Sequence, residues 1–176
     1  MRDLLALADD ETRRLWDGLT LGYTEAPGHP LLREVVARLY QTPAADDVLM
    51  FAGAEEAIYA AMRVLLRPGD HAIVTWPGYQ SLYEVARATG ADVSLWKLQP
   101  VARGWRVNVD ALRAAIQPNT KLIVTNFPHN PTGALPSLAE WQAIVSIARD
   151  AGCYLFSDEV YRLLEYAPED RVPAAV

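Results

Sequence analysis

The feature that most constrains the fold of this chain is a regular alternation of short apolar runs with longer segments of helical periodicity. The runs are rich in β-branched and aromatic residues, which favours strands. In the segments between them apolar side chains recur every three or four residues, which favours helices. Strands are predicted over residues 47–52, 71–76, 92–98, 121–126 and 153–158, and helices over residues 54–66, 80–89, 109–117 and 137–150. This alternation predicts an α/β fold: a three-layer domain with a mostly parallel sheet and helices on both faces.

Residues 1–45 do not follow this alternation. Their pattern is mainly helical, and it is interrupted by the Gly/Pro-rich segment Pro27-Gly28-His29-Pro30. We expect residues 1–45 to form an N-terminal helical arm that packs outside the sheet, and residues 46–176 to form one domain. In that domain the run 92–98 alternates apolar and polar residues, which predicts a half-exposed strand near a sheet edge.

Composition narrows the possible functions. The chain is 51% hydrophobic and 22% charged, which is typical of a folded domain with one sizeable core. Its net charge of −6 gives no basic footprint for nucleic acid, and no apolar stretch approaches the length of a membrane span. The single cysteine, Cys153, excludes an internal disulfide and suits a reducing compartment. We therefore expect a cytoplasmic protein that binds neither nucleic acid nor a membrane.

Ligands of open α/β sheets bind at the carboxyl ends of the strands, so the residues after each predicted strand are candidates for a site. Gly53-Ala54-Glu55 opens the first helix of the domain, where free backbone N–H groups and the helix dipole favour an anion. A strand-to-helix turn also needs a glycine for structural reasons alone. Trp76 and Tyr79 follow the second strand and could stack on a flat ring, although an aromatic there more often belongs to a core or an interface.

At the other two strand ends, the residue pattern is harder to explain by structural needs alone and therefore favours a functional role. Residues 126–133, Asn-Phe-Pro-His-Asn-Pro-Thr-Gly, predict a rigid, non-helical loop that presents Asn130, whose amide both donates and accepts hydrogen bonds. Asp158 ends the last strand, where a partly buried carboxylate needs a partner such as a protonated heterocyclic nitrogen. A salt bridge or a helix N-cap would also satisfy it. Tyr161 lies three residues farther along, close enough to face the same ligand.

Together these segments resemble the large domain of the class I/II aminotransferases, the fold type I enzymes that depend on pyridoxal 5'-phosphate (PLP). The most specific segments are residues 126–133 and 157–161, Ser-Asp-Glu-Val-Tyr, and Asp158 follows Asn130 by 28 residues with a helix between them. Upstream, the stretch from Tyr23 through Gly28 to Leu32-Arg33 is similar to a Tyr…Gly…Leu-Arg stretch of that family. The resemblance covers residues 20–166.

The resemblance implies roles at the ring of the cofactor. Asp158 would bind the pyridinium nitrogen and keep it protonated, so that the ring serves as an electron sink. Asn130 and Tyr161 would hydrogen-bond the phenolic oxygen. Tyr79 would stack on the ring, with Trp76 as the fallback for that role.

The resemblance also implies roles at the phosphate. Backbone N–H groups around Gly53, Ala54 and Glu55 would hold the phosphate, and Tyr23 would reach the phosphate of the neighbouring subunit, which implies a homodimer. The sequence departs from the family here, because Ala54 and Glu55 stand where relatives often have a hydroxyl residue. A Glu55 carboxylate would repel a phosphate unless its side chain points away.

A further implication concerns what the sequence does not contain. The Schiff-base lysine of the family lies farther beyond Asp158, whereas the lysines here are Lys97 and Lys121, neither at a motif position. We therefore expect no catalytic residue in this chain and interpret it as a fragment, inactive by itself, of an incomplete PLP-dependent transferase large domain without its C-terminal strands and small domain. The strand predicted at 47–52 would then lose its neighbours and leave an exposed, poorly paired edge beside an apolar gap.

The predicted function is PLP binding within a parent aminotransferase that acts on amino acids and 2-oxo acids, with no metal site. A PLP-dependent carbon–sulfur lyase uses the same ring contacts and stays open as an alternative, as does a non-catalytic PLP-fold module. A nucleotide-binding α/β enzyme is disfavoured, because the first strand-to-helix turn lacks Gly-x-Gly-x-x-Gly and no Gly-x-x-x-x-Gly-Lys occurs.

Overall fold

The computed structural model describes residues 2–23 and 25–175, and the chain divides into two units, residues 1–50 and 51–176. The second unit contains a parallel sheet whose strands follow the predicted runs closely. They are β1 (His71–Trp76), β2 (Asp92–Lys97), β5 (Thr120–Asn126) and β6 (Tyr154–Asp158). The strand order is β2-β1-β5-β6, and each neighbouring pair is parallel. A short antiparallel pair, β3 (Gln99–Pro100) and β4 (Trp105–Arg106), follows β2.

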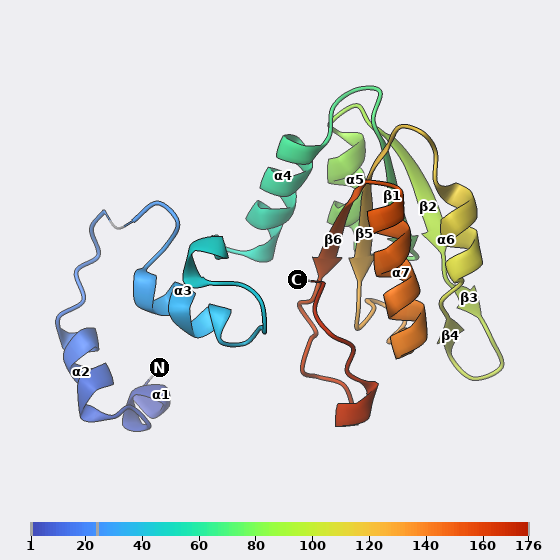
Figure 1. Ribbon diagram of the computed structural model, residues 1–176. Coiled ribbons are helices and arrows are strands. Elements are labelled where there is room, and N and C mark those ends of the chain that lie inside the picture. The colour runs from blue at the N-terminus through green and yellow to red at the C-terminus, as the bar shows by residue number, and fades with distance from the viewer. Residues whose placement is uncertain (1, 24, 176) are drawn as a thin grey trace. The chain divides into compact units, whose positions relative to one another are not determined.

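Helices cover both faces of the sheet (Figure 1). On one face lie α4 (Ala54–Leu65) and α5 (Gln80–Arg87), and on the other lie α6 (Val109–Ala115) and α7 (Leu138–Asp150). Alternate side chains of each strand point to opposite faces. Leu122 and Val124 of β5 therefore pack with α4 and α5, whereas Ile123 between them packs with α6 and α7. The predicted three-layer α/β fold is confirmed.

Burial distinguishes the central strands from the outer ones. The side chains of β1 and β5 are buried almost without interruption, because helices cover both of their faces. β2 is an outer strand with half-exposed side chains, as its alternating pattern predicts. β6 is the other outer strand, and in the described part of the chain it pairs with β5 alone. The register of this pair sets Asn126 opposite Asp158, so the candidate residue Asp158 lies beside Asn126 at the ends of their strands.

Local capping signals fix the starts of the last two helices. The Ser137 Oγ accepts the N–H of Glu140 at 3.3 Å, and the Glu140 Oε2 accepts the N–H of Ser137 at 2.7 Å, which is the predicted capping box of α7. At α6 the cap is Asn108, whose Oδ1 accepts the N–H of Ala111 at 3.0 Å.

The first unit consists of short helical elements joined by irregular segments. It contains α1 (Arg2–Ala6), α2 (Asp10–Asp17), α3 (Pro30–Ala37) and the 3-10 turn η1 (Ala45–Asp47). The predicted interruption before α3 includes Gly28, which has a φ of 106°. A Cβ at this position would clash with the side chain of Met50, whose N–H donates to the Pro27 carbonyl at 2.8 Å. Position 28 therefore requires glycine for its backbone conformation and for this close approach.

The prediction of a strand at residues 47–52 is wrong. The chain forms η1 up to Asp47, and residues 48–52 have no sheet partner in the described part of the chain. Leu49 and Phe51 are exposed despite their apolar side chains. An apolar run becomes a strand only when a neighbouring strand pairs with its backbone, and none of the described strands pairs with this run.

The chain around β6 closes the core on the α6–α7 face. Cys153 lies directly before β6, partly buried against that core, and its Sγ lies 3.5 Å from the Ala148 carbonyl oxygen. Burial raises the pKa of the Cys153 thiol, which suits a small apolar residue rather than a nucleophile. Beyond β6 the chain forms a 3-10 turn, η2 (Pro168–Asp170), and then packs Val172 and Ala175 against the same core.

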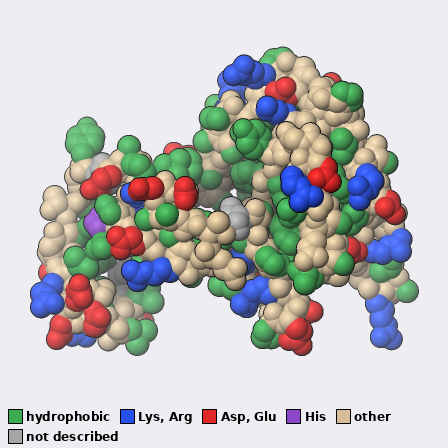
Figure 2. Space-filling view, viewed as in Figure 1, with side chains coloured by type: hydrophobic (Ala, Val, Ile, Leu, Met, Phe, Trp, Pro, Cys, Tyr) green, Lys and Arg blue, Asp and Glu red, His purple; other side chains and the backbone are tan. Residues whose placement is uncertain are grey.

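On the face drawn in Figure 2, acidic and basic side chains are interspersed. Within residues 2–23 and 25–175, none of the helices has the length and apolarity needed to cross a membrane.

Candidate cofactor site at the carboxyl ends of the strands

A cavity of about 230 Å³ lies where the predicted site residues converge. It is formed by the ends of β5 and β6, the start of α4 and the residue that begins α5. Five predicted residues line it, together with three others that were not predicted: Ala54, Tyr79, Asn130, Asp158 and Tyr161, with Ile58, Asn126 and Val160. This is the end of a parallel sheet at which ligands bind.

Asp158 is the last residue of β6 and is partly buried. Its Oδ1 accepts the N–H of Val160 at 3.1 Å. Burial raises the pKa of its carboxyl group; the Val160 hydrogen bond opposes this, and the charges of Glu159 and Glu55 add to it. Neither structural alternative is present: no ion pair with Asp158 occurs among the described residues, and turns rather than a helix follow it.

The neighbouring acid faces the other side of the sheet. Glu159 and Ser157 border a small hollow beside Trp141 of α7. There the Glu159 carboxylate accepts the Ser157 Oγ at 3.1 Å and pairs with Arg162 at 3.3 Å. The Glu159 carboxylate is therefore neutralised in a structural contact, whereas Asp158 faces the cavity and forms no ion pair with the residues that the structure describes.

A buried side chain that the sequence argument missed holds the site together. Asn126 is 1% exposed. Its Nδ2 donates to the backbone oxygen of Asp158 at 3.0 Å, and its Oδ1 accepts the backbone N–H of Asn130 at 2.8 Å. One amide therefore fixes the backbone of both predicted polar residues. The available signal was an Asn as the last residue of a fully buried apolar strand.

The loop that carries Asn130 is constrained by its sequence. The Phe127–Pro128 and Asn130–Pro131 peptide bonds are cis. His129 is 2% exposed, and its Nδ1 lies 2.7 Å from the Thr132 Oγ1. Its backbone N–H donates to the Ala134 carbonyl at 3.0 Å, and its carbonyl accepts the N–H of Gly133 at 2.7 Å. The loop is closed on itself and presents the half-exposed Asn130 to the cavity.

The opposite end of the cavity is the N-terminus of α4. Gly53 is the N-cap with extended backbone, and Ala54 lines the cavity. Among the described residues, no acceptor contacts the N–H groups of Ala54 and Glu55, which belong to the first turn of a helix. Gly53 and Glu55 border this end without being among the lining residues. These N–H groups are positioned to bind an anion.

Aromatic residues follow β1. Tyr79 lines the cavity, whereas Trp76 is 38% exposed and is not among the lining residues. The Tyr79 hydroxyl donates a hydrogen bond to the Glu55 Oε1, which raises the pKa of Tyr79. Of the two aromatics considered for stacking, the structure brings Tyr79 to the site. Tyr23 belongs to the first unit and is fully exposed.

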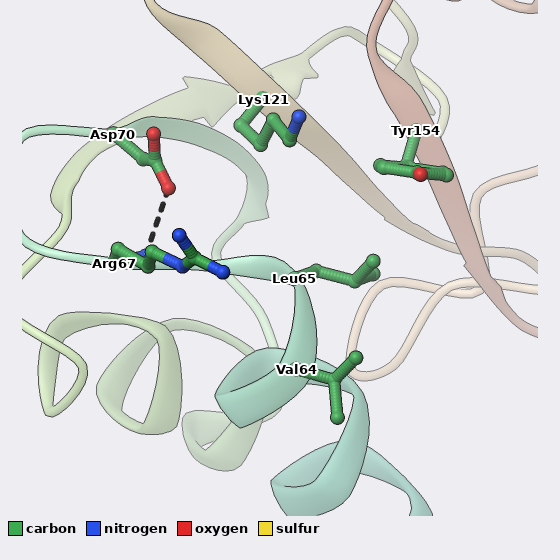
Figure 3. Close-up of a pocket in the computed structure, with 6 residues that line it drawn as sticks. All are labelled: Val64, Leu65, Arg67, Asp70, Lys121 and Tyr154. Carbon is green, nitrogen blue, oxygen red and sulfur yellow. Dashed lines mark hydrogen bonds between the residues drawn. The ribbon is translucent and has the colours of Figure 1, made fainter.

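The two lysines lie elsewhere. Lys97 ends β2, and Lys121 lies near the start of β5, where its Nζ is 5.6 Å from the centre of the Tyr154 ring. Figure 3 shows Lys121 beside a second, larger hollow of about 350 Å³. This hollow lies at the amino ends of the strands, and its sides combine Val64, Leu65 and Tyr154 with charged residues. In the part of the chain that the structure describes, no group of three or more His, Cys, Asp or Glu could hold a metal.

Comparisons with known proteins identify the family of this chain. The model of the family "Aminotransferase class I and II" matches residues 4–175. The "Probable N-succinyldiaminopimelate aminotransferase" of Mycobacterium tuberculosis is 37% identical over 159 residues, which cover 87% of this chain and 40% of that protein. An arginine–pyruvate transaminase of Pseudomonas aeruginosa is 34% identical over 159 residues, 88% of this chain and 40% of that protein.

Solved structures give the same result. A PLP-dependent aminotransferase from Streptococcus suis has a TM-score of 0.88 at 34% identity, covering 99% of this chain and 46% of that one. The N-succinyldiaminopimelate aminotransferase of M. tuberculosis has a TM-score of 0.82 at 34% identity, covering 93% of this chain and 44% of that one. The chain thus spans about 40% of the length of the curated relatives that it matches. By sequence and by fold, it belongs to the class I and II aminotransferase family.

Proposed function

We propose that this chain forms the cofactor-binding part of a PLP-dependent aminotransferase that acts on an amino acid and a 2-oxo acid. The observation that carries the proposal is the partly buried Asp158 carboxylate, which forms no ion pair with the described residues and whose pKa is raised by burial. A carboxylate in this condition gains most from a cationic N–H donor in the cavity. The pyridinium nitrogen of PLP is such a donor.

The donor set fits the rest of the cofactor. The Ala54 and Glu55 N–H groups would hold the phosphate, with the Gly53 turn beside them. At the other end, Asp158 would accept the pyridinium N–H. Asn130 and Tyr161, which line the same cavity, would hydrogen-bond the phenolic oxygen, and the Tyr79 ring would lie against the pyridine ring. The polar groups of the cavity therefore match an anionic end and a cationic end.

When bound, PLP supplies an electron sink for the amino acid α-carbon. The chain itself contributes electrostatics and orientation. Asp158 would keep a proton on the ring nitrogen, because a protonated nitrogen would neutralise a carboxylate that has no ion-pair partner among the described residues. Asn126 fixes the spacing of Asp158 and Asn130 by bonding to both backbones. Neither Lys97 nor Lys121 lies at the cavity, so we propose that neither anchors the cofactor covalently.

Cofactor titration tests the proposal directly. PLP added to the 176-residue chain should quench its tryptophan fluorescence in a saturable manner. D158N should weaken binding about tenfold or more, because a neutral amide replaces the charge partner of the ring nitrogen. The matched control is D110N, which changes an exposed acid in the first turn of α6. Equal affinity of D158N and D110N would contradict the assignment of Asp158.

Reaction type is tested in a longer protein that contains this chain. An aminotransferase converts the amino acid to its 2-oxo acid while the partner 2-oxo acid becomes an amino acid. An elimination enzyme releases ammonia instead, with no need for the second substrate. Stoichiometric formation of both transamination products supports the proposal, and ammonia release without them contradicts it.

Assembly, domain roles and location complete the proposal. Tyr23 is fully exposed, and we propose that it reaches the phosphate of a partner subunit in a homodimer, with residues 1–45 as an arm and residues 46–176 as the cofactor domain. Light scattering of the longer protein tests the dimer. A monomer that binds PLP with full affinity, or a Y23F variant with unchanged affinity, would count against the role of Tyr23. The lone cysteine suits a cytoplasmic location.

A further inference from the structure

Glu55 places a negative charge at the end of the cavity where the phosphate would bind. It is the second residue of α4, directly beside the free N–H groups. Its Oε1 accepts two hydrogen bonds, one from the Tyr79 hydroxyl and one from the Ser81 Oγ at 2.8 Å. These bonds lower the pKa of the Glu55 carboxyl group, with Tyr79 the larger cause, so the side chain is ionised at neutral pH.

We propose that Tyr79 and Ser81 form a clasp that holds the Glu55 carboxylate away from the N-terminus of α4 and thereby leaves its N–H groups available to the cofactor phosphate. The proposal rests on the proposed function, because it assigns a role at the same site. It makes Ser81 a positioning residue that determines affinity for the phosphate without contacting it.

The helix end shows why such a clasp is needed. Two adjacent acids, Glu55 and Glu56, occupy the first turn of α4. Carboxylates in a first turn are attracted to the positive end of the helix dipole and to its free N–H groups. The Glu56 Oε2 is already occupied by the Ala52 N–H at 2.8 Å. Without its two hydroxyl partners, Glu55 would be the acid free to move toward the N–H groups and compete with a phosphate.

The two hydroxyls suit this task because both are neutral donors. Ser81 lies in the first turn of α5 and Tyr79 is its N-cap, so α5 and α4 set the distance between the clasp and the acid. Hydrogen bonding to Glu55 raises the pKa of Tyr79 above its ordinary value of 10.0. The Tyr79 hydroxyl therefore keeps its proton, and goes on donating, throughout the physiological pH range.

A double-mutant cycle in the 176-residue chain tests the clasp. The probes are PLP, inorganic phosphate and pyridoxal, which has the ring without the phosphate. S81A removes one hydroxyl from a partly exposed position and should weaken PLP and phosphate binding about three- to tenfold, the loss of one hydrogen bond to a charged acceptor. Pyridoxal affinity should not change. In the E55Q background, which has no carboxylate to restrain, S81A should have no effect.

A second variant and a ligand-free readout separate the possible failures. Y79F keeps the ring and removes the other donor, so it should weaken phosphate binding in the native background and not with E55Q. Independently, NMR titration of the Glu55 carboxyl should show its pKa rising toward 4.5 in S81A.

The possible outcomes separate the clasp from the proposed function. If neither the native chain nor any of the variants binds pyridoxal or PLP, the proposed function is wrong, while the NMR titration of Glu55 still tests the clasp. If PLP binds and S81A has the same effect with and without E55Q, the clasp is overturned and the proposed function stands. If S81A weakens pyridoxal as much as PLP, Ser81 supports the ring site and not the phosphate.

Discussion

His129 gives the most direct prediction about acid stability. It is 2% exposed, its Nε2 has no hydrogen-bond partner in the described structure, and burial lowers its pKa from 6.5 to about 4. The ring therefore stays neutral in the folded chain, while in the unfolded chain it binds a proton below pH 6.5. Because the unfolded state binds more protons, stability from this group is complete above pH 6.5 and is lost as the pH falls toward 4.

The magnitude follows from the two pKa values. Between pH 7.5 and pH 5, His129 alone should remove about 2 kcal/mol from the free energy of unfolding, and the full shift corresponds to about 3 kcal/mol. H129Q replaces the ring with an uncharged amide and should abolish this part of the pH dependence, whatever it does to stability at pH 7.5. His71 is also buried with a lowered pKa, so some dependence remains in the variant.

Urea unfolding at pH 7.5, 6.5, 5.5 and 5.0 gives the free energy of unfolding of the native chain and of H129Q. The difference between the two isolates His129, because titratable groups that both proteins contain contribute equally and cancel. H29Q is the control, because His29 is exposed and lies in the other unit. It should retain the full dependence. NMR titration of the His129 ring provides an independent value of its pKa. A midpoint near 6.5, or identical pH profiles for H129Q and the native chain, would refute the reasoning.

Three further predictions concern the site and its support. N126A should cost about 2 kcal/mol in urea unfolding, because it leaves the Asn130 N–H without a partner and removes one of the two hydrogen bonds to the Asp158 carbonyl, which keeps the Phe127 N–H; a loss below about 1 kcal/mol would contradict its bridging role. S137A should cost about 1 kcal/mol by removing the cap of α7, whereas a surface serine-to-alanine change elsewhere should be near neutral. D158N should stabilise the chain at pH 7, since the folded pKa of Asp158 is raised and its burial penalty grows as the pH rises above 3.8; unchanged stability between pH 4 and 7 would count against that shift.

The local pattern of apolar and polar residues was sufficient to predict most strands and helices of the fold. Strands and helices of the sheet domain were predictable because the two have different periodicities, and α6 and α7 also begin at side-chain caps, Asn108 and Ser137. The prediction for residues 47–52 was wrong because it depended on a non-local contact. The apolar pattern of these residues is that of a strand, but pairing is a contact with distant residues, and none of the described residues supplies it.

The site divides in the same way. Asp158 and Asn130 were predictable because each ends a strand or follows one, and parallel strands end at the same edge. The bridging of these two by Asn126 was not predictable, because its side chain bonds to backbone groups four and 32 residues farther along the chain. The sequence also indicated that a Glu55 carboxylate would repel a phosphate. It did not show that two hydroxyls, 24 and 26 residues farther along the chain, donate hydrogen bonds to this carboxylate.

The register of β5 and β6 has a consequence for the identity of the site acid. Asp158 and Glu159 are consecutive, and residues of a strand alternate between faces, so a slip of one residue would turn Glu159 toward the cavity and Asp158 toward Arg162. The hydrogen-bonded ladder therefore selects which of two similar acids is available for chemistry and which is consumed in holding the chain together. The two side chains carry the same carboxylate and differ by a single methylene; the choice is made by backbone pairing between two neighbouring strands.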